Sequence, residues 1–386
     1  MFGLRGGPSD VIDPRTPDFI ERKAKWPKFE KRNVANLFGP NLRNDEGLEV
    51  WLNATVTVPT FEPNGRVTEI SARSDRGQEL RVEAADFVIA AGGIESTRLA
   101  LSFNRASADN LMATDSPVGH YFHEHLTAHC ASVEVRDRRE LGRLAGFLFQ
   151  RDGMRNLRFE LSGSARTREA LPAAYTQLVF SSEQGGPFDV LRDIYRGFQA
   201  KSRPSAAQIA FLAGHAPWLL RAAWSRFIDH RLLPPDDAQF ALNLAIEQQP
   251  KFESRIALSD RTDSLGQPLA MINWRPSAAD QENFRAVTGL VGSYWQTMGF
   301  DCLGLFAARR EAAEELVQCG GSHHPGGTLR MGRDAREGVV DADLRIFGSP
   351  NLWVASSAVF PRAGGANPTL TLVALALRLG DRLARD

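Results

Sequence analysis

Residues 87–101, FVIAAGGIESTRLAL, decide the fold class of this chain. The apolar run from Phe87 to Ala91 is typical of a buried strand, and Gly92 and Gly93 end it. Residues 94–101 then place apolar side chains at helical spacing. A buried strand that feeds a helix through glycines predicts an α/β unit.

The C-terminal region predicts a second α/β piece. Residues 351–355 have the pattern of a strand, and residues 369–384 have that of a strongly periodic helix. Asn367 is a favoured N-cap and Pro368 suits the first helical position, because proline lacks the N–H that finds no partner there. We therefore expect the helix to begin at Asn367-Pro368.

The other parts of the chain predict less regular segments. Residues 1–46 are rich in Pro, Gly and charge, and we expect irregular structure there. Residues 48–58, 67–72 and 79–82 predict a β-meander, and residues 126–319 mix alternating and helical patterns. The fold class we expect is therefore α/β with an inserted α+β domain.

Composition excludes several classes of function. Lys plus Arg and Asp plus Glu both number 46, so no net field attracts nucleic acid.

Cys130, Cys302 and Cys319 are too scattered for a disulfide framework, which indicates free thiols in a reducing, cytoplasmic location. No transmembrane segment is expected. Residues 206–224 predict an amphipathic helical hairpin, with contact to a membrane surface as the minor alternative.

Six segments together resemble the glucose-methanol-choline (GMC) oxidoreductases. Residues 324–332, HPGGTLRMG, and the segments that follow within residues 339–354 resemble the closing signature of that family. Residues 90–96 resemble its second flavin-domain motif, and residues 118–125 resemble its segment of a glycine followed by an acid and a histidine. The match implies a flavoprotein that oxidises a CH–OH group of an alcohol or sugar, with FAD as cofactor.

Three central segments are similar to the bacterial branch of the family that acts on sugars and glycosides. They are residues 247–250, 254–259 and 273–275. We therefore expect a sugar or glycoside as the small-molecule substrate.

The resemblance implies two catalytic residues. His324 matches the family's active-site base, which takes the hydroxyl proton while a hydride moves to flavin N5. Asn367 matches the partner that hydrogen-bonds the same substrate oxygen. Without the resemblance, His324 would be interpreted as a hydrogen-bonded histidine in a Gly-rich turn, and Asn367 as a plain N-cap.

The resemblance also implies the residues that line the FAD. Val56 matches the position whose backbone faces the adenine, and Ala91 and Gly92 match one turn along the dinucleotide. Ser356 and Ser357 match the other turn. The helix start Asn367-Pro368-Thr369 suits negative charge on the reduced flavin, because the free N–H groups of a helix N-terminus favour anions.

The family's N-terminal fingerprint is not evident in this sequence. Full-length relatives begin with a strand, a Gly-x-Gly-x-x-Gly turn and a helix that holds the pyrophosphate. We therefore expect a partial FAD-binding domain, residues 47–125 and 320–386, around a substrate-binding domain, residues 126–319. The alternative is a non-catalytic, truncated remnant, or one subunit of a split oxidoreductase whose partner chain supplies the missing segment.

Histidines 120, 123, 125 and 129 allow a metal site as a further interpretation, since 123, 125 and 129 share one face of an extended strand. No matching Cys, Asp or Glu constellation accompanies them, so we expect no metal.

Overall fold

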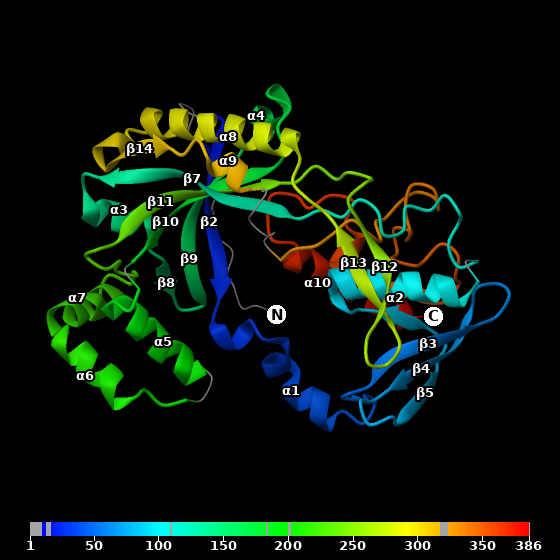
Figure 1. Cartoon of the computed structure of the whole chain (residues 1–386). Helices are drawn as coiled ribbons and strands as arrows, with labels where there is room; N and C mark the ends of the chain where they lie inside the picture. The colour runs from blue at the N-terminus through cyan, green and yellow to red at the C-terminus, as the bar shows by residue number, and fades with distance from the viewer. Residues whose placement is uncertain are drawn as a thin grey trace. The chain divides into compact units, whose positions relative to one another are not determined.

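The computed structural model describes residues 10–12, 17–108, 110–182, 184–199, 202–316 and 323–385, and Cys319 lies outside them. The chain divides into two compact units, each assembled from three segments (Figure 1). Unit 1 consists of residues 1–47, 128–245 and 282–315. Unit 2 consists of residues 48–127, 246–281 and 316–386.

An eight-stranded sheet forms the centre of unit 1. Its strand order is β1-β2-β9-β10-β11-β7-β14, and β8 pairs with β9. The pairing of β2 with β9 is antiparallel over nine residues, from Phe19 opposite Leu161 to Pro27 opposite Gly153. The strands are β1 (Asp10–Ile12), β2 (Phe19–Pro27), β7 (His125–Val135), β8 (Leu148–Gln150), β9 (Gly153–Leu161), β10 (Ala174–Ser181), β11 (Gln239–Glu247) and β14 (Gly304–Ala308).

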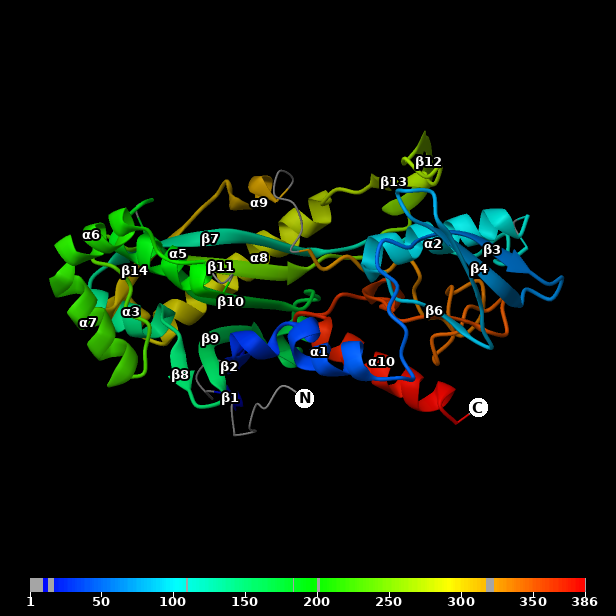
Figure 2. The same cartoon turned by 90° about the horizontal axis from the view of Figure 1, so that it is seen from below.

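Helix α8 (Ala278–Thr297) buries an apolar face in unit 1. Phe284, Val287, Val291 and Trp295 recur at helical spacing and are buried, and the Trp295 indole donates a hydrogen bond to the Gly304 carbonyl. The remaining helices, some visible in Figure 2, are η1 (Phe29–Lys31), α1 (Val34–Asn44), α3 (Arg138–Ala145), α4 (Gly163–Arg168), α5 (Pro187–Gln199), α6 (Ala206–Gly214), α7 (Ala216–Phe227), η2 (Phe300–Cys302) and α9 (Ala312–Glu315).

The expectation of irregular structure over residues 1–46 differs from what the structure shows. Residues 19–27 form strand β2 and residues 34–44 form helix α1. Strand β2 has a mixed, charged sequence, and its regular conformation comes from its long antiparallel pairing with β9. Tertiary context therefore overrides the local pattern here.

Unit 2 contains three small sheets and two long helices. A meander, β3 (Thr55–Phe61), β4 (Val67–Arg73) and β5 (Glu79–Glu83), confirms the predicted hairpins, whereas residues 48–52 form no strand. β6 (Phe87–Ile89) pairs in parallel with β15 (Leu352–Val354), and β12 (Arg255–Thr262) pairs with β13 (Pro268–Asn273). The helices are α2 (Gly92–Ala106), η3 (Ser357–Val359) and α10 (Thr369–Leu383).

The core of unit 2 joins segments that are far apart in sequence. Phe87 and Ile89 of β6, Phe103 of α2 and Trp353 of β15 are buried in one apolar cluster. The buried Asn351 side chain accepts the Val67 N–H at 2.9 Å and donates to the Val67 and Ala85 carbonyls. The predicted strand and glycine turn into a helix are thus confirmed, and the mixed α/β fold class with them.

Within the described residues, no helix is both long enough and apolar enough to cross a bilayer. The functional roles predicted for the domains stay predictions.

Candidate functional site

Two turns of unit 2 meet at one edge of the parallel pair formed by β6 and β15. Ala91 and Gly92 follow β6, and Ser356 and Ser357 follow β15. The register places Ile89 opposite Val354, and the next amide, Ala355 N–H, donates to the Ile89 carbonyl at 2.9 Å. The carboxyl ends of parallel strands are the usual place for ligands in α/β folds. The structure therefore brings these four predicted residues to one edge.

The segment that carries His324 lies against both turns. The Ser357 hydroxyl donates to the Pro325 carbonyl at 2.7 Å, and a Cβ atom at Gly93 would lie 2.7 Å from that same carbonyl oxygen. The hydroxyls of Thr97 and Thr328 are also 2.7 Å apart. A glycine at 93 is thus needed for the close approach of α2 to the His324 segment.

His324 is held by a neighbouring strand-like segment, residues 123–125. The Glu124 carboxylate accepts the His324 backbone N–H at 2.8 Å, and His123 forms an antiparallel bridge with Gly326. The rings of His125 and His324 stand perpendicular, with their centroids 5.3 Å apart. The His324 Nδ1 atom is buried and has no hydrogen-bond partner within the described part of the chain.

A buried carboxylate, Glu247, fixes the loop that leads to Asn367. It accepts two hydrogen bonds from the Arg362 guanidinium, at 3.1 and 3.2 Å, and one from the Gly364 N–H at 3.0 Å. The Gly364 carbonyl accepts a hydrogen bond from His125 Nε2 at 2.8 Å. His125 therefore contacts the His324 ring on one side and the loop before α10 on the other.

The start of α10 differs from the prediction. Pro368, with φ −74° and ψ −12°, is the N-cap, and no side chain caps the helix. The Pro368 carbonyl accepts the first helical hydrogen bond, from Leu372, because proline's fixed φ is compatible with a helical turn. Asn367 lies one residue before this N-cap, and its side chain is exposed. Its predicted role as N-cap is therefore wrong.

Helices α2 and α10 of unit 2 both begin without a side-chain cap. Helix α2 has Ala91 as its N-cap and α10 has Pro368, and neither receives a capping side-chain hydrogen bond. Such ends keep backbone N–H groups available for an anion.

Burial keeps the histidines of this site neutral. Desolvation lowers the pKa of His324, and positive charge on His125 or His323 would lower it further. Desolvation also lowers the pKa of His125, although the hydrogen bond to the Gly364 carbonyl and the charge of Glu247 act to raise it. Burial lowers the pKa of His123 to about 4. An imidazole whose pKa lies below 6.5 is unprotonated at neutral pH and can accept a proton.

Two of the histidines considered as alternative metal ligands, His120 and His123, have other partners. His123 Nδ1–H donates to the Tyr121 carbonyl at 2.9 Å and His120 stacks on Phe252. Among the described residues, no group of three or more His, Cys, Asp or Glu side chains could hold a metal ion.

Val56 lies on β3 opposite Ala72, where a bulge separates it from Val58. Its side chain packs against the apolar core of unit 2. Whether its backbone faces an adenine stays a prediction.

Glu124 and Glu247 were not predicted as site residues. Both lie in segments that carried the family resemblance, the acid-histidine pair at 124–125 and the run at 247–250. Their roles depend on which backbone N–H groups come within reach, and a sequence pattern does not show that.

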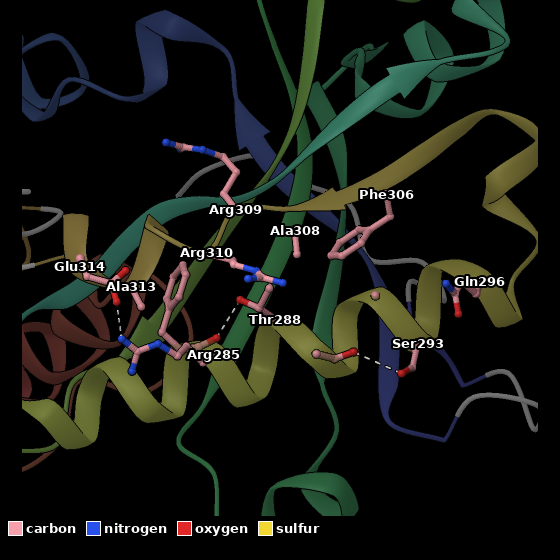
Figure 3. A pocket seen from close by; sticks show the side chains of 13 residues that line it. Arg285, Thr288, Ser293, Gln296, Phe306, Ala308, Arg309, Arg310, Ala313 and Glu314 are labelled. Atoms are coloured by element: carbon pink, nitrogen blue, oxygen red, sulfur yellow. Dashed lines mark hydrogen bonds and ion pairs between the residues drawn. The ribbon is translucent and has the colours of Figure 1, made fainter.

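A separate cavity of about 670 Å³ lies in unit 1 beside α8 and β14. Figure 3 shows the Arg285–Glu314 ion pair among the residues that line it. None of the predicted site residues lines this cavity.

Comparison with known proteins supports the sequence resemblance. Residues 250–376 match the family model described as GMC oxidoreductase. The match covers this C-terminal region of the chain. A relative, 2-methyl-1,2-propanediol dehydrogenase of Mycolicibacterium austroafricanum, is 27% identical over 335 residues, 83% of this chain and 52% of the relative.

Two other relatives are oxidases from Streptomyces. 6'''-Hydroxyparomomycin C oxidase of Streptomyces lividus is 30% identical over 155 residues, 40% of this chain and 27% of the relative. Paromamine 6'-oxidase of Streptomyces fradiae is 30% identical over 205 residues, 47% of this chain and 36% of the relative. The chain therefore spans about half, or less, of the length of these curated relatives.

The crystal structure of pyridoxine 4-oxidase from Mesorbium loti has the same fold, with a TM-score of 0.55 over 92% of this chain and 60% of that chain. The sequence identity is 16%, so this likeness concerns the fold alone.

Proposed function

We propose that this chain is the part of an FAD-dependent GMC oxidoreductase that oxidises a CH–OH group, with His324 as the base. The observation that carries the proposal is the position of His324, held through its backbone N–H by Glu124 beside the edge where the β6 and β15 turns meet. A neutral imidazole accepts the proton of an alcohol hydroxyl, which must leave as the carbon loses its hydride. FAD, when bound, supplies flavin N5 as the hydride acceptor.

The residues present fit an anionic dinucleotide. The N-termini of α2 and α10 keep N–H groups without side-chain caps. Gly92 has a φ of +79° and open space where a Cβ would lie, so its backbone is accessible to a close ligand. Ala91, Gly92 and the segment Asn367-Pro368-Thr369 would hold the cofactor mainly through the backbone.

Ser356 and Ser357 would contribute through their backbone rather than their hydroxyls. The Ser356 side chain is buried and accepts the Ala358 N–H at 3.2 Å. The Ser357 hydroxyl donates to Pro325 instead. These side-chain hydrogen bonds leave the backbone of the turn as the part that would contact the cofactor.

Asn367 is proposed to hydrogen-bond the substrate oxygen from which His324 takes the proton. Its loop is fixed through Gly364 to Glu247 and His125, and His125 touches the His324 ring. This chain of contacts would keep the amide and the imidazole at a constant separation. A sugar or glycoside is the proposed substrate, which the sequence resemblance favours and the aminoglycoside-derived names of two relatives support.

A second candidate involves a partner chain. The paired β6 and β15 form a sheet of two strands in the described residues, and Val88 of β6 is exposed. A partner chain that adds the missing dinucleotide-binding segment would cover this apolar surface. The hydrogen bond from the His324 N–H to Glu124 and the contact of its ring with His125 favour either arrangement over a non-catalytic remnant. The reducing, cytoplasmic location predicted from the thiols is kept as part of the proposal.

The test begins with the visible spectrum of the purified chain after incubation with FAD and gel filtration. Retained flavin absorbance supports binding by this chain alone, and assays with sugars, glycosides and simple alcohols then follow with an artificial electron acceptor. His324→Ala should abolish turnover and keep flavin absorbance. Near-normal turnover in that variant would refute the assignment of the base. A colourless chain that gains flavin only with a partner would support the second candidate.

A further inference from the structure

Unit 1 exposes an unusual number of large apolar side chains on three consecutive helices, α5, α6 and α7. Among the described residues, nine of the twenty-six large hydrophobic side chains that are exposed lie between residues 191 and 228. The three helices form one group between β10 and β11 in sequence, and they lie together in both views (Figures 1 and 2). Exposed apolar patches of this kind mark interaction surfaces.

Helix α7 presents an apolar stripe to solvent. Leu220, Trp224, Phe227 and the adjoining Ile228 recur at i, i+4, i+7 and i+8, and their exposed fractions lie between 58 and 73%. This spacing puts them on one face of the helix, which in a globular domain normally faces the core. Here that face is uncovered.

Helix α5 repeats the arrangement. Leu191, Tyr195 and Phe198 recur at i, i+4 and i+7, and all three are exposed, while no residue of α5 is buried. Two helices of one group therefore carry apolar stripes whose side chains are exposed.

The same region is positively charged. Residues 187–231 contain seven Lys and Arg and three Asp, with no Glu, although the whole chain has a formal net charge of +0. Arg192 pairs with Asp189, and Arg221 pairs with Asp236. Arg196 and Arg203 form no ion pair with any described residue. The apolar stripes are thus interspersed with cationic side chains.

We propose that α5, α6 and α7 dock this protein onto an anionic membrane surface. Trp224 and Tyr195 are amphipathic side chains suited to the headgroup region, and the stripes would be buried at the acyl boundary. Arginines near an anionic leaflet are attracted by its negative surface potential. The helices have 13, 9 and 12 residues, so they lie in the interface and do not cross it.

A lipid surface fits these observations better than a protein partner. The stripes lie on two separate helices, α5 and α7, and a membrane needs no complementary shape. It also meets apolar and cationic side chains at the same depth, since arginine stems lie along apolar surface while their charged ends reach phosphates.

The proposal is tested by flotation of the full chain with phosphatidylcholine vesicles that contain either no anionic lipid or about 30 mol% phosphatidylglycerol. We expect binding to the anionic vesicles, weakened by salt and by Arg196→Glu with Arg203→Glu. Replacing Leu220, Trp224 and Phe227 together by Ser should lower binding at least about tenfold.

The matched control replaces three other exposed apolar residues, Val50, Trp51 and Leu52, by Ser. Like the first triple variant, it removes one Trp and two other large apolar side chains. It should bind vesicles as the wild type does. Circular dichroism verifies that both triple variants are folded.

Three results would overturn the proposal. One is a wild-type chain that floats with neither vesicle type. Another is equal binding by the Leu220, Trp224 and Phe227 variant. The third is a wild-type chain that binds no vesicles but self-associates, as measured by light scattering, and loses this self-association in the Leu220, Trp224 and Phe227 variant.

Discussion

At the residue scale, the chemistry proposed for this chain depends on the protonation of one imidazole. His324 must be neutral to accept a proton, and burial together with the nearby His125 lowers its pKa below the ordinary 6.5. The site therefore needs no further group to deprotonate the base at neutral pH.

The pH dependence of turnover follows from this shift. As the pH falls through the lowered pKa, His324 becomes protonated and loses its capacity as a base, so kcat/KM should fall only below pH 6.5 and be level above it. A pH–rate profile of the flavin-loaded protein measures this. An acid limb centred above pH 7 would contradict the assignment.

Glu124 is predicted to position His324 through its backbone. Glu124→Ala removes the acceptor for the His324 N–H and should lower kcat about tenfold or more, with little change in KM. Glu124→Gln keeps an oxygen acceptor and should retain most of the activity. Equal losses in both variants would show that the negative charge, rather than the hydrogen bond, matters.

At the element scale, the site depends on how closely α2 approaches the His324 segment. A Cβ atom at position 93 would lie 2.7 Å from the Pro325 carbonyl oxygen, which is backbone and cannot rotate away. The first turn of α2 and the residue after His324 are therefore in direct contact.

Gly93→Ala should move the Pro325 carbonyl and destabilise the protein by about 1 to 3 kcal/mol, with a larger fractional loss of turnover. The control is Gly380→Ala, inside α10, where no atom lies within 4 Å of the new Cβ. That variant should gain up to about 1 kcal/mol from helix propensity. Urea unfolding compares the two, and a Gly93→Ala protein as stable as wild type would contradict the predicted contact.

At the scale of the whole molecule, several histidines resist protonation in the folded state. Burial lowers the pKa of His123, His125, His129 and His324, and for His123 the value is about 4. The unfolded chain binds protons on these groups near pH 6.5, whereas the folded chain does so only at lower pH. The free energy of unfolding should therefore decrease as the pH falls below 6.5.

For His123 the decrease continues to about pH 4 and reaches about 3 kcal/mol. Urea unfolding at pH values between 7.5 and 5, above the range where most carboxyl groups titrate, measures the histidine contribution. His123→Asn should reduce the slope in that range. An unfolding free energy that stays constant from pH 7 to pH 5 would contradict the shifted pKa values.

The sequence by itself determined the local elements of unit 2. The strand, glycine turn and helix of residues 87–106 and the strand at residues 352–354 are as predicted, because apolar periodicity and glycines act over a few residues. Two segments that carry the GMC resemblance belong to this parallel pair: residues 90–96 follow β6, and residues 351–354 contain β15.

Only the tertiary structure decided the features that depend on distant partners. β2 is a strand because β9 pairs with it, and Pro368 rather than Asn367 caps α10. Glu124 reaches the backbone of His324 across 200 positions of sequence. The stripes on α5 and α7 have the spacing of core faces, and their exposure follows from which neighbours the fold provides, a property that periodicity alone does not contain.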